Sequence, residues 1–481
     1  MKKILVAAFF MLTVLFDSGA KITMPSIFSD NMVLQRQTDV AFWGTAKPSG
    51  TVTVTVSWQR GKTVLKADSE GKWFTRITTP EAGGPYTITV SDGKKLTFRN
   101  VLVGEVWLCS GQSNMEMPVK GFKGQPVEGG IETILSARPE VPIRMCTVRK
   151  TVSPNPKNDC DVIWMENTAD AVANTSAVGY FFARNLQTAL NVPVGIIVSS
   201  WGGTLIEPWI CRDVFEKEYP SVDLAFLDKA ELPEKSQYKP CTLYNAMIHP
   251  LIPYTIKGWI WYQGESNRDM YKDYTSLQTS YASMMRRLWG NERMPFYFVQ
   301  IAPYSFKGNA DGETAAMFME AQARSLDSIP YSGMATTADI GEKWCIHPSR
   351  KQEVAGRLAM MALRQDYGFP LDGVFAPMFD RMVIRKDKKI VLYFKNSECG
   401  IGPVNENLPC FEVAGEDRVF HPAVGRVMRG YETIEITCPD CIESPVAVRY
   451  AFHNYAPGIL RNGRGVAVAP FRTDDWPIVY P

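Results

Sequence analysis

Four polar segments of the chain each follow an apolar run typical of a buried strand, and together they contain the groups needed for acyl transfer. These candidate residues are Ser113, Gly202, Gly203, Gln263, Asn267 and His347. A serine hydroxyl becomes a strong nucleophile when a neighbouring base removes its proton. Backbone N–H groups and side-chain amides can stabilise the oxyanion that forms after attack. The sequence therefore offers a nucleophile, a base and oxyanion donors, provided that the fold brings them together.

Ser113 stands just after the apolar run 105–110, where a helix would begin. The N–H groups at the start of a helix favour negative charge and can hold an oxyanion. The same position also suits a serine that only caps a helix. The surrounding residues do not form the Gly-x-Ser-x-Gly turn of α/β hydrolases, and no Gly-Lys-Ser/Thr phosphate loop follows.

The other candidates also have structural alternatives. Gly202 and Gly203 would let backbone N–H groups approach a ligand closely, although most Gly-Gly pairs form turns. Gln263 ends an aromatic run, so its amide is either an oxyanion donor or part of a polar turn. His347 is the one of four histidines that follows a predicted strand of the central region beside acidic residues. It is the best candidate base, with a helix-capping histidine as the alternative.

Residues 104–368 predict an α/β region that would position these groups. Apolar runs typical of strands alternate there with segments of helical periodicity. The strand candidates are 105–110, 194–199, 257–262, 296–301 and 334–338, and the helix candidates are 177–190, 271–289, 314–326 and 349–365. This alternation predicts a parallel sheet with helices on both faces. Reactive groups in such sheets lie at the carboxyl ends of the strands.

Two regions of short strands flank this α/β region. In residues 21–103, apolar side chains alternate with period two, as in 51–56 and 86–90, and Gly and Pro clusters separate the runs. This pattern predicts a β-sandwich-like domain. Residues 369–481 return to short strand-like runs. They predict a second β-sandwich-like region, which could pack with the first.

Composition excludes several classes of protein. The chain has 481 residues, of which 45% are hydrophobic, and its net charge is +2. It is too apolar to be disordered and too long for a single core. The balanced charge argues against a nucleic-acid-binding protein. Ten cysteines are too few for a disulfide scaffold of this length, and the Cys438-x-x-Cys441 pair has no partner pair at zinc-site spacing.

Residues 1–20 have the organisation of a secretory signal peptide. Lys2 and Lys3 precede an apolar run that ends at Phe16, and Ser18-x-Ala20 matches the small-x-small cleavage pattern. The apolar run is shorter than the roughly 20 residues that span a bilayer. The sequence therefore predicts cleavage after Ala20, a secreted or periplasmic protein, and no membrane span.

Three motifs carry a resemblance to a known family. They are Gly-Gln-Ser-Asn-Met-Glu at 111–116, Trp-Tyr-Gln-Gly-Glu-Ser-Asn at 261–267 and Ile-His-Pro at 346–348. Together they resemble the sialate O-acetylesterases of the SGNH hydrolase superfamily, and the likeness extends over nearly the whole chain after residue 20. The resemblance implies a flavodoxin-like SGNH core, with a parallel sheet in a three-layer α/β/α arrangement. It also implies that no metal or organic cofactor is needed.

By the family's pattern, Ser113 is the nucleophile and His347 is the base. The implied oxyanion donors are the N–H of Ser113, the N–H of Gly202 or Gly203, the amide of Gln263 and, as a further candidate, Asn267.

The acid of the triad departs from the superfamily pattern. An aspartate often precedes the catalytic histidine by three residues, and Trp344 occupies that position here. The third member is then Glu342, Asp339 or a backbone carbonyl, or it is absent. A carbonyl would orient the imidazole but stabilise its charge less than a carboxylate does.

The resemblance implies a serine esterase that removes acetyl groups from sialic acid, free or on a glycan. Related acetylxylan esterases share the first two motifs, so a polysaccharide acetylesterase is the nearer alternative. A non-catalytic glycan-binding protein is the farther one. A retaining glycosidase could use Glu116, Glu265 and Asp339, but nothing in the sequence pairs these carboxylates. The near-zero net charge means that a sialic acid carboxylate would need a local Arg or Lys.

Overall fold

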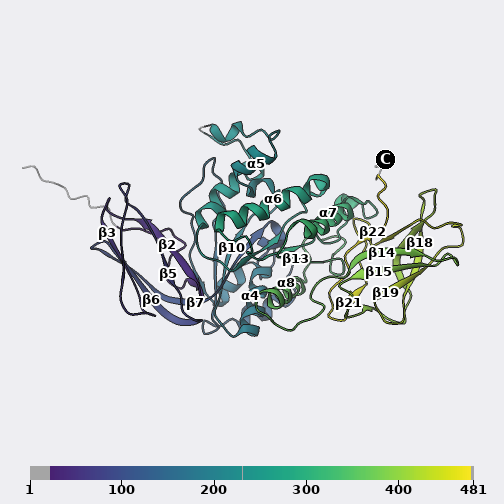
Figure 1. Cartoon of the computed structure of the whole chain (residues 1–481), viewed down its shortest axis with the longest axis horizontal. Coiled ribbons are helices and arrows are strands. Elements are labelled where there is room, and N and C mark those ends of the chain that lie inside the picture. Colours follow the sequence, from purple (N-terminus) through teal and green to yellow (C-terminus); the bar gives the residue numbers. More distant parts are fainter. Residues whose placement is uncertain (1–21, 230, 478–481) are drawn as a thin grey trace, which may run out of the picture.

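The computed structural model describes residues 22–229 and 231–477, so the predicted signal peptide lies outside the described residues. An α/β region lies between two β-rich regions along the long axis of the molecule (Figure 1). The three regions follow one another in sequence order, as the hydrophobic patterns predict.

The N-terminal region consists of a sheet and a separate strand pair. The sheet contains β1 (Val33–Gln35), β3 (Thr51–Val56), β4 (Thr63–Lys66), β6 (Gly83–Ser91) and the first part of β7 (Lys95–Gly111). The separate pair is β2 (Asp39–Thr45) with β5 (Lys72–Thr78). In β3 the valines are buried and the threonines face outward, because successive side chains of a strand point to opposite faces. The predicted period-two strands are confirmed.

The central sheet is parallel over six strands, in the order β13-β12-β11-β7-β10-β8. The strands that join β7 are β8 (Ile143–Thr147), β10 (Val194–Ser200), β11 (Gly258–Tyr262), β12 (Phe296–Val299) and β13 (Ser332–Ala335), and β9 (Met165–Glu166) pairs antiparallel with β8. The five predicted strands are present. The sequence missed β8, which lies near the edge of the sheet and whose short apolar run is interrupted by Arg144.

Helices cover both faces of this sheet, as predicted (Figure 1). One face packs against α4 (Ala177–Leu190) and α8 (Lys351–Asp366), and the other packs against α6 (Tyr271–Trp289) and α7 (Thr314–Ser328). The shorter helices are α1 (Ser113–Glu116), α2 (Gly130–Ser136), α3 (Ala169–Asn174) and α5 (Arg212–Glu218).

β7 belongs to two sheets. Its first part pairs with β1 and β6, and its last residues pair with β10 and β11. The boundary expected between residues 103 and 104 therefore falls inside a continuous strand. This strand delivers the first candidate motif to the carboxyl edge of the central sheet.

The C-terminal region is a seven-stranded antiparallel sheet with a short strand pair beside it. The sheet has the order β14 (Met378–Ile384), β15 (Ile390–Lys395), β19 (Thr433–Thr437), β18 (Phe420–Val427), β17 (Leu408–Ala414), β20 (Ala447–Tyr450), β22 (Phe471–Arg472), and β16 (Ile401–Gly402) pairs with β21 (Arg461–Asn462). This region lies at the opposite end of the molecule from the N-terminal sheet (Figure 1). The expectation that the two β regions pack together is therefore wrong. The C-terminal strands instead contact α7, through ion pairs such as Arg472–Glu320.

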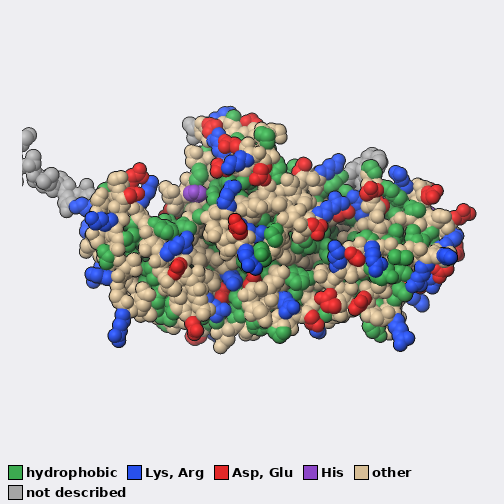
Figure 2. Space-filling view, in the orientation of Figure 1, with side chains coloured by type: hydrophobic (Ala, Val, Ile, Leu, Met, Phe, Trp, Pro, Cys, Tyr) green, Lys and Arg blue, Asp and Glu red, His purple; other side chains and the backbone are tan. Residues whose placement is uncertain are grey.

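Acidic and basic side chains are interspersed over the face shown in Figure 2. No helix within the described ranges is both long enough and apolar enough to cross a membrane. The thiols of all ten cysteines are free, and five of these cysteines are buried.

Candidate active site

Ser113 begins α1 directly after the end of β7. The turn before it depends on Gly111, whose φ is +140°. A Cβ atom at Gly111 would lie 2.1 Å from the carbonyl oxygen of Tyr262, so only glycine lets β7 end this close to β11. Ser113 is partly exposed, and its backbone N–H makes no hydrogen bond within the described residues. The fold therefore presents both the hydroxyl and the amide of Ser113 at the sheet edge.

The side chain of Gln112 binds the turn that follows β11, and this turn lies below Ser113. Its Oε1 accepts hydrogen bonds from the N–H of Gly264 at 3.1 Å, the N–H of Ser266 at 3.3 Å and the Nε2 of Gln263 at 3.2 Å. Gln112 itself is buried. The motifs at 111–116 and 261–267 are thus joined through one amide oxygen.

The amides of Gln263 and Asn267 lie in this buried floor. The Nε2 of Gln263 has three acceptors, including the Oδ1 of Asn267 at 2.7 Å, and its Oε1 accepts from the hydroxyl of Tyr274 at 2.8 Å. The Nδ2 of Asn267 donates to Glu207 at 3.0 Å. Both residues are fully buried. Their donors are already occupied, so the arrangement supports a structural role for these two amides.

Gly202 and Gly203 follow β10 and lie beside Ser113. A Cβ atom at Gly202 would be 3.3 Å from the Cβ of Ser113, so the two backbones are in close approach. The N–H of Gly202 donates to Glu116 Oε2 at 2.5 Å. The N–H of Gly203, at φ +75°, makes no hydrogen bond within the described ranges. Gly203 and Ser113 therefore present unoccupied amide donors, whereas Gly202 is engaged by a carboxylate.

Glu116 connects this edge to a cation. Its Oε1 lies 2.7 Å from Lys150 Nζ, which in turn lies 5.8 Å from the ring centre of Trp201. The sequence offered Glu116 only as a glycosidase carboxylate. In the structure the other two carboxylates that a glycosidase would use, Glu265 and Asp339, are buried in separate networks, so these three acids do not form a catalytic pair.

His347 lies in the loop that follows β13. Its Nδ1 is 2.6 Å from the amide oxygen of Gln125, and its ring meets Phe122 edge to face at 5.3 Å. Asn114 Nδ2 donates to the carbonyl oxygen of Ile346 at 3.0 Å, so the residue after Ser113 holds the residue before His347. No hydrogen bond joins Ser113 to His347 among the described residues.

The pKa of His347 is lowered to about 4. Burial is the main cause and the positive charge of Lys351 adds to it, whereas the Glu116 carboxylate acts in the opposite direction. Both burial and a nearby cation disfavour the imidazolium. His347 is therefore neutral at neutral pH, which is the form that accepts a proton.

Neither carboxylate suggested as the triad acid bonds to His347 within the described residues. Asp339 is buried in ion pairs with Arg357 at 2.7 Å and Arg461 at 2.9 Å. Glu342 accepts from the N–H of Ser349 at 2.7 Å. The observed partner of the imidazole is Gln125. The sequence could not reveal this partner, because Gln125 is 222 positions away and lies in a segment without a recognisable motif.

A buried charged cluster lies directly under Ser113. Asn114 accepts a hydrogen bond from Lys351 Nζ at 2.5 Å and donates to Glu265 Oε1. Burial lowers the pKa of Lys351 to about 7, partly against the charge of Glu265, and burial raises the pKa of Glu265. Sequence reasoning missed Lys351, since a lysine at the start of a helix is usually exposed.

A cavity of about 340 Å³ opens beside α1. Its charged lining residues are Glu116, Lys120, Arg149 and Lys150. The lining therefore contains three cations and one carboxylate. Lys150 pairs with that carboxylate at 2.7 Å, and Arg149 pairs with Asp161 at 3.2 Å.

The family model, the two relatives and the solved structure that match this chain all indicate a carbohydrate acetylesterase. Residues 103–362 match the family model described as carbohydrate esterase, sialic acid-specific acetylesterase. The chain is 30% identical to the sialate O-acetylesterase of Homo sapiens over 388 residues, covering 73% of this chain and 72% of that protein. It is 29% identical over 410 residues to the sialate O-acetylesterase of Mus musculus, with 73% and 75% covered. The crystal structure of a carbohydrate acetylesterase from Xanthomonas citri superposes with a TM-score of 0.85 at 33% identity, covering 95% of this chain and all of that one.

Proposed function

Since this chain belongs to the sialic acid-specific acetylesterase family of carbohydrate esterases, we propose that it is a serine esterase that removes O-acetyl groups from sialic acid. Ser113 is the nucleophile and His347 the base. The observation that carries this assignment is the contact between Asn114 and Ile346, which joins the neighbour of the serine to the neighbour of the histidine.

The hydrogen bond to Gln125 sets the reactive form of the imidazole. An amide oxygen only accepts, so Nδ1 carries the hydrogen and Nε2 keeps its lone pair. Nε2 takes the proton of Ser113 as Oγ attacks the acetyl carbon. Catalytic hydrogen bonds are often formed only in the complex with substrate. A neutral amide orients the ring but stabilises the imidazolium less than a carboxylate would.

The oxyanion is held by the N–H groups of Ser113 and Gly203. Collapse of the tetrahedral intermediate breaks the bond to the sugar oxygen, and His347 returns its proton to that oxygen. Water, deprotonated by His347, then attacks the acetyl-Ser113 ester. Collapse of this second tetrahedral intermediate breaks the bond between the acyl carbon and Ser113 Oγ, His347 returns the proton to Oγ, and acetate leaves. The Glu116 carboxylate keeps the Gly202 N–H oriented beside this hole.

We also propose a flavodoxin-like SGNH core between residues 104 and 368, flanked by β domains at 21–103 and 369–481. The strand order supports it, because β10-β7-β11-β12-β13 reproduces the flavodoxin-type order 2-1-3-4-5 with β8 added at one edge. Ser113 then stands beside the point where the connections reverse direction, between β7 and β11. Ligands bind at this point in open α/β sheets.

The first prediction tests the nucleophile and the base. Ser113→Ala and His347→Ala should each lower acetate release from O-acetylsialic acid and from p-nitrophenyl acetate by ~10³-fold or more. A fluorophosphonate should label the wild-type protein but not Ser113→Ala. Ser69→Ala, in the exposed turn between β4 and β5, and His453→Ala, in the C-terminal region, are the matched controls and should retain activity. Folded Ser113→Ala or His347→Ala protein with wild-type rates would refute the mechanism.

A polysaccharide acetylesterase is the second candidate. It is favoured by the likeness to the Xanthomonas citri carbohydrate acetylesterase, which extends over nearly the whole chain. The cationic cavity beside α1 favours the anionic sugar instead. Parallel kcat/KM measurements on O-acetylsialic acid and on acetylated xylan distinguish the two, and activity on xylan alone would exclude the sialate assignment.

We further propose that the protein is exported and that residues 1–20 are removed. The mass of the protein recovered from the periplasm or the medium should then correspond to a chain that starts at Lys21. Recovery of the full-length chain in the cytoplasm would contradict this.

A further inference from the structure

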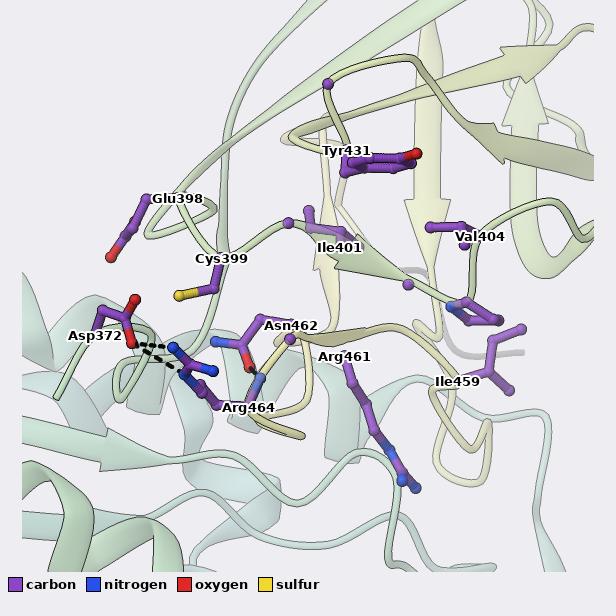
Figure 3. A pocket seen from close by; sticks show the side chains of 15 residues that line it. Asp372, Glu398, Cys399, Ile401, Val404, Tyr431, Ile459, Arg461, Asn462 and Arg464 are labelled. Carbon is purple, nitrogen blue, oxygen red and sulfur yellow. Dashed lines mark hydrogen bonds and ion pairs between the residues drawn. The ribbon is translucent and has the colours of Figure 1, made fainter.

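A second cavity, of about 820 Å³, lies in the C-terminal region (Figure 3). None of the groups described around Ser113 lines it. Three segments form it, and they contribute residues from 398–404, 430–431 and 459–464, with Asp372 at one end. Nothing in the proposed esterase mechanism uses these residues.

One side of this cavity is apolar and the other side is polar. In Figure 3 the apolar residues Ile401, Val404, Tyr431 and Ile459 lie on one side, and Asp372, Glu398, Cys399 and Arg464 lie on the other. Tyr431 is 55% exposed, Val404 is 41% exposed and Ile459 is 36% exposed. Exposed apolar side chains gathered around one hollow mark a binding surface rather than isolated surface residues.

The two arginines of the cavity are already paired with carboxylates. Arg464 pairs with Asp372 at 2.6 Å, and Arg461 reaches back to Asp339 at 2.9 Å. Glu398 adds a further negative charge at the rim. The cavity therefore has no unpaired guanidinium for an anionic ligand. It does offer both donors and acceptors, which suits hydroxyl groups.

The cavity walls are fixed by hydrogen bonds. Asn462 is buried, donates to the carbonyl oxygen of Gly373 at 2.7 Å and accepts from the N–H of Arg464 at 2.9 Å. The N–H of Ile401 donates to the carbonyl oxygen of Tyr431 at 2.6 Å. Tyr431 has φ +64°, a conformation that costs energy for an aromatic residue, so the surrounding structure holds its backbone in this conformation.

We propose that this cavity binds neutral sugar residues of the glycan that carries the acetyl ester. The face of Tyr431 would stack on the apolar C–H face of a pyranose ring, and Asp372, Arg464 and Glu398 would bind its hydroxyl groups. This inference rests on the proposed function, because it assumes an acetylated glycan as substrate.

The cavity is attached rigidly to the catalytic region. The N–H of Gly458 donates to the carbonyl oxygen of Ala338 at 2.8 Å, and Arg461 bonds to Asp339 in the loop that leads to His347. A glycan bound here would stay at a fixed separation from Ser113. It would raise the effective concentration of its acetyl groups at the nucleophile.

Binding is tested by calorimetry on the full-length protein with cellohexaose, xylohexaose and poly-N-acetyllactosamine. At least one should bind, and Tyr431→Ala should weaken that binding ~10-fold. Tyr431→Phe, which keeps the ring, should bind normally. Tyr331→Ala is the matched control, since Tyr331 is 45% exposed with φ +48° on a distant turn. The proposal is overturned if none of the three sugars binds, or if Tyr431→Ala binds as wild type does.

A kinetic test separates this inference from the proposed function. The ratio of kcat/KM on an acetylated oligosaccharide to kcat/KM on p-nitrophenyl acetate should fall several-fold in Tyr431→Ala. An unchanged ratio would count against the cavity. Sugar binding that depends on Tyr431, in a protein without any esterase activity, would support the proposed sugar-binding cavity and refute the proposed esterase function.

Discussion

At the level of single residues, burial is the main influence on the protonation of His347, and two charges of opposite sign modify it. Lys351, in the buried cluster below Ser113, lowers the pKa of His347. Glu116, which lies beside Ser113, raises it. Burial is the larger cause and lowers the pKa. The imidazole therefore becomes protonated only in acid.

The acid limb of kcat/KM should report this pKa. Activity should be constant around neutral pH and fall as the pH drops through about 4, because protonated His347 cannot accept the serine proton. Acetate release measured from about pH 2.5 to about pH 8, with circular dichroism to monitor folding, checks this. An inflection near the pKa of an ordinary histidine would show that burial does not lower the pKa of His347 in the active enzyme.

Substitution of the two charges should move this limb in opposite directions. Lys351→Met removes a cation, which favours the imidazolium, so the inflection should move to higher pH. Glu116→Gln removes an anion, so the inflection should move to lower pH. Lys343→Met is the control. Lys343 is exposed in the loop that contains His347, so this substitution should leave the acid limb unchanged. Shifts in the same direction for both variants would contradict this account.

Motifs predict which residues lie at the site but not the contacts that each side chain makes. Ser113 and His347 could be selected because each follows a predicted strand. The sequence could not tell that the Gln263 amide lies below the sheet edge, since an exposed and a buried amide have the same local pattern. Gln125 and Lys351 act through contacts over more than 200 residues, which only the fold creates.

At the level of elements, the site depends on how closely β7 and β11 approach each other. The predicted strands and helices of the α/β region are present because their hydrophobic periods are long and regular. The turn geometry at Gly111 was not predictable, since it follows from the position of the Tyr262 carbonyl on another strand.

Gly111→Ala should therefore separate the strand ends. The new methyl group would meet the Tyr262 carbonyl, and we expect a loss of at least ~2 kcal/mol in the free energy of unfolding together with most of the activity. Gly356→Ala in α8 is the contrasting variant, because the nearest atom to its new Cβ lies 4.0 Å away. It should gain about 0.5–1 kcal/mol. Urea unfolding and acetate release measure both, and a Gly111→Ala protein like wild type would contradict the role of this turn.

At the level of the whole molecule, Asp339 joins the catalytic region to the C-terminal region. Its carboxylate is buried between Arg357 of α8 and Arg461 of β21. The sequence suggested Asp339 as a catalytic acid, because an acidic residue near a histidine suits both roles. Its burial between two arginines supports a structural role.

Asp339→Asn should consequently affect stability rather than the ionisation of His347. Removal of one charge from a buried network costs about 3–5 kcal/mol. Asp228→Asn breaks an exposed pair with Arg212 and should lower the free energy of unfolding far less, because solvent screens an exposed ion pair. The midpoint of unfolding reports the structural role of Asp339. The acid limb of kcat/KM, measured under conditions well below that midpoint, reports the ionisation of His347. A displaced acid limb in folded Asp339→Asn protein would restore Asp339 as a candidate acid.

The continuity of β7 also has a consequence for the order in which the chain is synthesised. Its N-terminal partners β1 and β6 precede it, whereas β10 and β11 emerge later. The first part of β7 can therefore be anchored while both edges of its last residues are still unpaired, and the central sheet would grow outward from this template. Unpaired strand edges attract other chains. A pause in synthesis between residues 111 and 194 is thus the interval in which the nascent protein should be most prone to aggregate.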